Sequence, residues 1–174
     1  MADPLAYFIT FSTYGTWLHG REQGSVDRDH NSPGHPFLPA DGELIAEKRG
    51  GMNQPEYRLD AERRAVVLKT IREVSQHRGW TLLAAHVRSN HVHIIVVGAM
   101  KPERIMGDFK AWCSRRLREA FGEPADRHRW TEHGSTIYLW TEADLAERLD
   151  YVLNGQGEPM ARFDGSSAPS EPHA

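Results

Sequence analysis

His86–Val97 reads HVRSNHVHIIVV, and within this stretch His91 and His93 are separated by a single residue. Alternate residues of a strand point to the same face of a sheet, so the two imidazoles are expected side by side. The residues that follow, 94–97, are apolar and mostly β-branched, which is typical of a strand buried on both faces. The spacing alone leaves two interpretations open: two neighbouring metal ligands, or two histidines that are satisfied within the core or at its edge.

The segments on both sides of this stretch predict an α+β fold. The sequence predicts strands at residues 7–14, 80–88, 91–97 and 136–140, and helices at residues 60–77, 102–121 and 141–154. Ser89 and Asn90 fall at a tight turn, so the second and third strands are expected to form a hairpin. This order is that of a ferredoxin-like, split-βαβ domain, in which helices pack on an antiparallel sheet.

The chain is predicted to form one domain over residues 1–158. Its 174 residues suit a single core. Residues 15–57 are rich in Gly, Pro, His and charged residues and are interpreted as a long insertion, either functional or partly disordered. Residues 159–174 are rich in Ser, Pro, Glu and Ala and are predicted to be a disordered tail.

Composition excludes several classes of protein. The net charge of -3 does not suit a strongly basic nucleic-acid binder. The lone Cys113 excludes an intramolecular disulfide framework and a Cys-rich zinc site. No signal peptide is visible and no apolar run approaches the ~20 residues that span a bilayer, so we expect a cytoplasmic protein with no membrane partner.

Any contact with nucleic acid is therefore expected at a local basic patch. Residues 101–129 hold eight Lys and Arg against five Asp and Glu. Four basic residues lie off the apolar stripe of the helix 102–121 and are the predicted phosphate contacts, with a solvated helix face as the alternative: Lys110, Arg115, Arg116 and Arg118.

The helix 141–154 carries the second informative pattern. Tyr151 is followed by Asn154 and, between two glycines, by Gln156. A tyrosine hydroxyl aimed at a metal-bound phosphate can act as a nucleophile in phosphoryl transfer. Two histidines are a poor site for most metals, but a hard divalent ion such as Mg²⁺ or Mn²⁺ with a further ligand also binds substrate phosphate. On the helix alone, Tyr151 is more simply interpreted as a residue at the edge of the core. His86 is interpreted as a paired strand-surface residue, with a place beside His91 and His93 across the hairpin as the alternative.

With both patterns in place, the sequence resembles the single-tyrosine HUH DNA transposases. These include the transposases of bacterial single-strand insertion sequences and the REP-associated tyrosine transposases. The segment 89–96, SNHVHIIV, is similar to their two-histidine motif, and the segment 149–157, LDYVLNGQG, is similar to their helix with the catalytic tyrosine. The similarity spans roughly residues 5–157.

The resemblance implies a role for each of these residues. Tyr151 would be the nucleophile, and His91 and His93 would bind the metal. The family's amide ligand usually lies four residues after the tyrosine, where this chain has Gly155. Gln156 is expected to complete the metal site, because the flanking glycines can end the helix and turn it back, with Asn154 as the alternative.

The function that the resemblance implies is a metal-dependent endonuclease and strand transferase acting on single-stranded DNA. Such an enzyme uses Mg²⁺ or Mn²⁺, forms a 5′-phosphotyrosine intermediate at hairpin-bearing DNA ends and works as a homodimer. Two alternatives are a domesticated hairpin-binding protein that does not cleave DNA, and an HUH relaxase or replication initiator.

Overall fold

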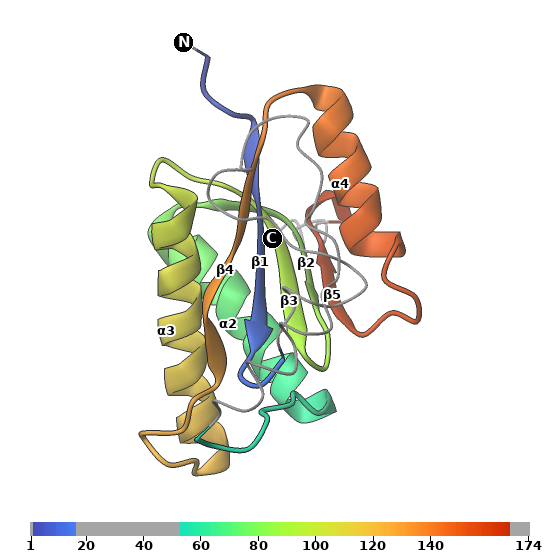
Figure 1. The fold of residues 1–174 in the computed structure, drawn as a ribbon. Helices are drawn as coiled ribbons and strands as arrows, with labels where there is room; N and C mark the ends of the chain where they lie inside the picture. The colour runs from blue at the N-terminus through green and yellow to red at the C-terminus, as the bar shows by residue number, and fades with distance from the viewer. Residues whose placement is uncertain (1, 17–52, 168–174) are drawn as a thin grey trace, which may run out of the picture.

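A five-stranded antiparallel sheet forms the centre of the protein (Figure 1). The computed structural model describes residues 2–16 and 53–167. The strand order is β4-β1-β3-β2-β5, so β3 lies in the middle. The strands are β1 (Ala6–Thr13), β2 (Thr81–Val87), β3 (His91–Val97), β4 (Trp130–Leu139) and β5 (Ala161–Asp164).

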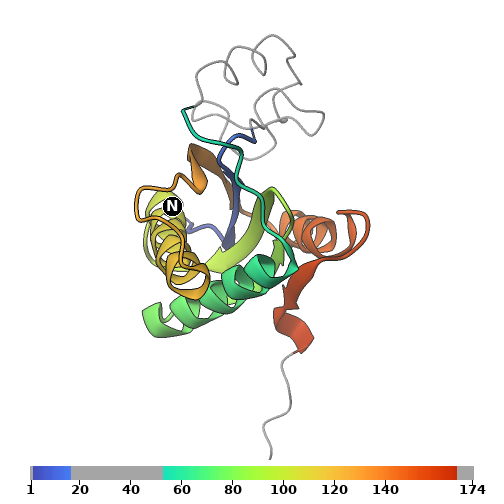
Figure 2. The ribbon, with the colours of Figure 1, turned by 90° about the horizontal axis from the view of Figure 1, so that it is seen from below.

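Two helices cover one face of the sheet and a third lies on the other. Helices α2 (Ala61–Arg78) and α3 (Pro102–Phe121) pack side by side, and α4 (Glu142–Asn154) lies opposite them (Figure 2). The side chain of Asp60 caps α2 by accepting from the Arg63 amide, and Thr141 caps α4 by accepting from Asp144. In the described residues, no helix combines the length and apolar character needed to cross a membrane.

Alternation along β3 divides the interior into two cores. Val92, Ile94 and Val96 face α2 and α3 within the larger core, whereas Ile95 belongs to the smaller core beneath α4. All three residues of the first set are fully buried, as is Ile95. The register of β3 therefore determines which side chains face α4.

The predicted α+β fold is confirmed. The order β4-β1-β3-β2, with α2 and α3 on one face, is the split-βαβ arrangement. The predicted hairpin is also present, with an Arg88 amide that donates to the His91 carbonyl. Strand β4 begins at Trp130 instead of residue 136, because the polar first half of this edge strand pairs with β1 through its backbone and shows no apolar alternation.

The chain stays in the sheet beyond the predicted end of the domain at residue 158. Residues Ala161–Asp164, expected to belong to a disordered tail, form β5 and pair with β2. Backbone pairing orders this short strand, and Arg72 of α2 packs on the ring of Phe163. Residues 168–174, and the insertion apart from residues 15–16 and 53–57, lie outside the described residues.

Replacing a central residue of β3 tests this division of the interior. Ile94→Ala should lower the free energy of unfolding by about 3 kcal/mol, because it leaves a cavity in the larger core. Val97→Ala is the matched control at the exposed end of the same strand and should cost well under about 1 kcal/mol. Urea denaturation measures both, and equal losses would contradict the assigned register.

Candidate functional site

His91 and His93 lie side by side on the face of the sheet that α4 covers. Their ring centroids are 4.7 Å apart, and the two residues are only 5% and 4% exposed. They alternate with Val92, which points into the opposite core. The structure therefore confirms the expected side-by-side placement and shows that the pair is buried.

Each histidine is held through its Nδ1 atom. His93 Nδ1 lies 2.8 Å from the hydroxyl of Thr10, its neighbour on β1, and His91 Nδ1 lies 2.7 Å from the amide oxygen of Asn90. An amide oxygen accepts a hydrogen bond, so the ring proton of His91 sits on Nδ1 and its lone pair on Nε2. Metal-binding histidines are commonly oriented in this way, by a partner at the nitrogen that does not bind the metal.

The Nε2 atom of His93 is buried and has no hydrogen-bond partner among the described residues. An orphaned polar atom in a protein interior is unusual and needs an explanation. A metal ion bound at this nitrogen would satisfy it.

Gln156 brings an oxygen to the same place. Its Nε2 donates to the Tyr151 carbonyl at 3.2 Å, which fixes the amide orientation and leaves Oε1 facing His91 Nε2 at 3.5 Å. The residue is 9% exposed, and its nearness to His93 raises the pKa of that histidine against the larger lowering by burial. Gln156 thus lies against both histidines.

Asn154, the alternative amide, points elsewhere. Its Nδ2 donates to Asp150 at 2.9 Å on the exposed side of α4. The helix ends at Gly155, whose amide donates to the Tyr151 carbonyl, and the chain then turns Gln156 inward. This geometry favours Gln156 over Asn154.

Tyr151 reaches the site from α4. Its ring stands edge-on to His93, with centroids 5.5 Å apart, and also contacts the ring of Phe8 on β1. The side chain is half-buried, because α4 covers the sheet incompletely at this point. The structure therefore brings together Tyr151, both histidines and Gln156, which lie up to 65 residues apart in the sequence.

The surroundings of His93 keep this histidine neutral. Burial lowers the pKa of His93 well below its ordinary value, and the nearby His91, His86 and Arg88 lower it further. A neutral imidazole is the form that binds a metal.

These residues fit a hard divalent ion. The Nε2 of His91 faces the Oε1 of Gln156, and a metal held by these two atoms and by the Nε2 of the adjacent His93 would satisfy the orphaned nitrogen. Within the described ranges, no group of three or more His, Cys, Asp or Glu side chains gathers as a metal-binding set. Open coordination positions would remain for substrate oxygens.

His86 is not a third ligand. It pairs with His93 across β2 and β3, as expected for neighbouring strands. The predicted position on the strand surface is wrong, because His86 is only 1% exposed. Its Nδ1 lies 3.0 Å from the Val152 carbonyl, and its Nε2 accepts from the Met160 amide at 2.9 Å. Both nitrogens are therefore used.

The sequence did not indicate the orienting roles of Thr10 and Asn90. The sequence predicts Asn90 only as a residue of the turn and Thr10 only as a residue of the first strand. The available signal was that Thr10 is a polar residue between the apolar Ile9 and Phe11, facing the same side as Phe8.

The basic residues of α3 do not join this site. Arg115, Arg116 and Arg118 are exposed on the helical layer, and the first two flank the ring of Trp112. Lys110 is separate from them, because its ammonium donates to the carbonyls of Thr131 and His133 on β4. Burial lowers the pKa of Lys110 to about 8.

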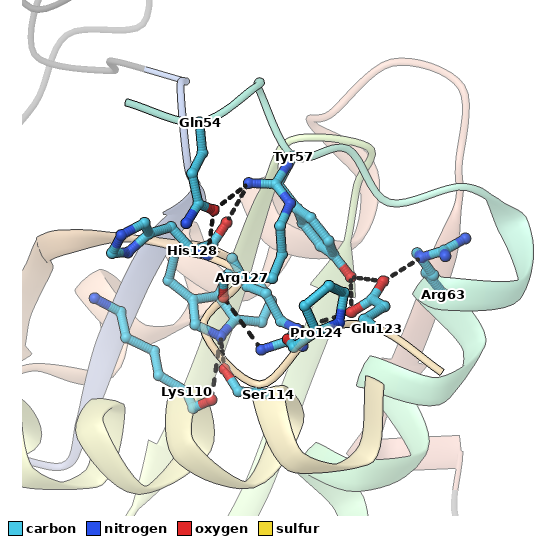
Figure 3. Close-up of polar contacts among 11 residues, drawn as sticks. Gln54, Tyr57, Arg63, Lys110, Ser114, Glu123, Pro124, Arg127 and His128 are labelled. Carbon is cyan, nitrogen blue, oxygen red and sulfur yellow. Dashed lines mark hydrogen bonds and ion pairs between the residues drawn. The ribbon is translucent and has the colours of Figure 1, made fainter. Parts of the chain in front are cut away.

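A polar cluster around Glu123 ties three segments together (Figure 3). Glu123 accepts from Tyr57, Arg63 and Arg129, which belong to the segment before α2, to α2 and to the loop before β4. Burial alone would raise the pKa of Glu123, but its hydrogen bonds lower it. Burial and Glu123 together raise the pKa of Tyr57 to about 12. Through Tyr57, the cluster anchors the segment that leads into α2.

Comparison with known families assigns the chain to one of them. Residues 53–142 match the family model described as IS200-like transposase, which covers just over half of the chain. The protein is a transposase enzyme and belongs to this family. The matched segment includes His91 and His93 and ends before Tyr151. None of the curated proteins matches the chain.

Two solved structures are similar to it. One is a protein of Deinococcus radiodurans R1 described as a transposase, with 16% identity and a TM-score of 0.45 over 87% of this chain and 91% of that one. The other is a REP-associated tyrosine transposase bound to a REP hairpin, with 13% identity and a TM-score of 0.46 over 87% and 66%.

The environment of Lys110 can be checked by titration. Its amine should titrate near pH 8 in a ¹³C NMR experiment, and Lys110→Met should remove that transition. Because the ordinary pKa of a lysine in the unfolded chain is about 10.4, the folded protein binds fewer protons between pH 8 and this value. The stability of the wild type should therefore rise relative to Lys110→Met across this window. A midpoint near 10 would contradict the buried position.

Proposed function

We propose that this transposase is a metal-dependent endonuclease and strand transferase that acts on single-stranded DNA, with Tyr151 as its nucleophile. One observation carries the proposal. The Nε2 of His91 faces the Oε1 of Gln156, and the adjacent ring of His93, whose Nε2 is orphaned, stands against the Tyr151 ring. These are the parts that phosphoryl transfer by a tyrosine requires.

His91, His93 and Gln156 would hold the metal, which is Mg²⁺ or Mn²⁺ in this proposal. When bound, the ion polarises a phosphate oxygen and offsets the charge that develops in transfer. Asn90 keeps the Nε2 lone pair of His91 directed into the site, and Thr10 orients the ring of His93. The buried rings also exclude water from one side of the site.

Tyr151 performs the covalent step. Its hydroxyl loses a proton to solvent, and Oη attacks the phosphorus of a DNA phosphodiester. The bond from phosphorus to the 3′ oxygen breaks, the leaving oxygen takes a proton as a 3′-hydroxyl, and the 5′-phosphate remains on Tyr151. Attack by a 3′-hydroxyl on this phosphotyrosine reverses the step and rejoins a strand, so no external energy source is needed.

The proposed substrate is single-stranded DNA that carries hairpins. The similar REP-associated tyrosine transposase was solved with a REP hairpin. Arg115, Arg116 and Arg118 are the proposed phosphate contacts on the helical layer, because they are exposed, whereas the ammonium of Lys110 is engaged. The proposal includes a homodimer, which the molecular mass in solution tests.

An adduct assay tests the proposed reaction. The wild type with hairpin-bearing single-stranded DNA and Mn²⁺ should form a protein–DNA adduct that survives SDS, and Tyr151→Phe should abolish it. Tyr138→Phe is the matched control, since this half-buried tyrosine contacts Tyr7 on the opposite face of the sheet. Hairpin binding without an adduct in the wild type would instead favour the binding protein that does not cleave.

Metal titration tests the orientation of the histidines. Thr10→Val keeps the shape of the side chain but removes the partner of His93 Nδ1, so Mn²⁺ affinity should fall at least about tenfold. Ser135→Ala is the control, because Ser135 pairs with Thr10 across β1 and β4 and its hydroxyl has no hydrogen-bond partner in the described part of the chain. Calorimetry without DNA measures both, and equal affinities for wild type and Thr10→Val would count against the site.

A further inference from the structure

The last turn of α4 is capped by side chains from outside the helix. Three successive carbonyls accept hydrogen bonds: Tyr151 from Gln156, Val152 from His86 and Leu153 from Arg162. Carbonyls at a helix end have no partner within the helix, so such contacts satisfy them. The turn that they hold is the one that carries Tyr151.

His86 links this turn to the segment that follows it. Because the Val152 carbonyl can only accept, the proton of the imidazole sits on Nδ1, and Nε2 is free to accept the Met160 amide. Met160 lies just before β5, which pairs with β2 beside His86. One buried ring thus joins β2, α4 and the strand that closes the sheet.

Arg162 acts from the neighbouring strand. It is the register partner of His86 on β5 and donates to the Leu153 carbonyl. The last turn of α4 contains no basic residue of its own, so Arg162 supplies the positive charge that a helix C-terminus favours. Figure 1 shows β5 beside the C-terminal end of α4.

Apolar packing fixes α4 less firmly than the other helices. Val152 is its one buried residue within the described fold, whereas α3 buries six residues and α2 buries five, of which three are apolar. Since apolar burial is the main attraction between a helix and a sheet, the polar contacts at the C-terminal turn carry more weight here.

We propose that His86 and Arg162 are positioning residues that hold the C-terminal turn of α4, and with it Tyr151, against the two-histidine site. This inference rests on the proposed function for its effect on DNA cleavage. Neither residue touches the reacting phosphate. A displacement of about 1 Å in a reacting group can slow a reaction about a hundredfold, so the loss of this hold should slow cleavage.

Two conservative variants separate the two bonds of His86. In His86→Asn the amide nitrogen lies near the position of Nδ1 and can still donate to the Val152 carbonyl. In His86→Gln the longer side chain places its amide near the position of Nε2 and can accept from Met160, but it loses the bond to α4. A role in folding alone predicts similar effects for both.

The rate of adduct formation and the DNA affinity should therefore respond differently. His86→Gln and Arg162→Met should slow single-turnover adduct formation by about tenfold to a hundredfold with unchanged DNA affinity, and His86→Asn should restore most of the rate. Arg72→Met is the matched control, because Arg72 packs on β5 from the side of α2 and does not contact α4. Equal rates in His86→Gln and His86→Asn would overturn the proposal.

Hydrogen exchange gives a second measurement that needs neither DNA nor metal. Amides of residues 148–154 should exchange faster in His86→Gln and Arg162→Met than in the wild type or His86→Asn, while those of α2 and α3 remain unchanged. Uniform exchange across the variants would overturn the positioning role. Absence of an adduct with wild-type protein would overturn the proposed function, and the order of exchange rates would still decide whether His86 holds α4.

Discussion

The alternation of residues along β3 is the constraint on which the rest of the structure depends. A shift of one residue in the register would turn His91 and His93 into the larger core and Ile94 toward α4. The apolar set facing α2 and α3 makes that shift costly, because its members are fully buried. Core packing on one face therefore fixes the placement of His91 and His93, the proposed metal ligands, on the other.

The chemistry of the site follows from how each polar group is satisfied. The Asn90 amide oxygen at Nδ1 leaves the lone pair of His91 on Nε2, and the bond from Gln156 to the Tyr151 carbonyl leaves the Gln156 oxygen facing His91. The same amide thus belongs to the proposed metal site and to the end of the helix that carries the proposed nucleophile. His86 and Arg162 complete that helix end from the sheet, so ligand geometry and tyrosine position share one supporting structure.

Local patterns made most of this fold predictable. The apolar run after His93 and the caps at Asp60 and Thr141 indicated a strand and two helices that the structure contains. Contacts between distant segments were not predictable. Strand β5 depends on backbone pairing with β2, Lys110 is bound by carbonyls of β4, and the partners of His86 lie 66 and 74 residues away. Sequence reasoning found Tyr151 and Gln156 because the resemblance supplied their roles, and the structure selected Gln156 over Asn154 by its orientation.

The central claim is that this face of the sheet holds a divalent ion beside a tyrosine nucleophile. The most direct measurement is an anomalous difference map from crystals grown with Mn²⁺. We expect a single strong peak about 2.2 Å from Nε2 of His91, Nε2 of His93 and Oε1 of Gln156, adjacent to Tyr151. A well-ordered site without a peak at saturating Mn²⁺, or a peak bound by other residues, would contradict it.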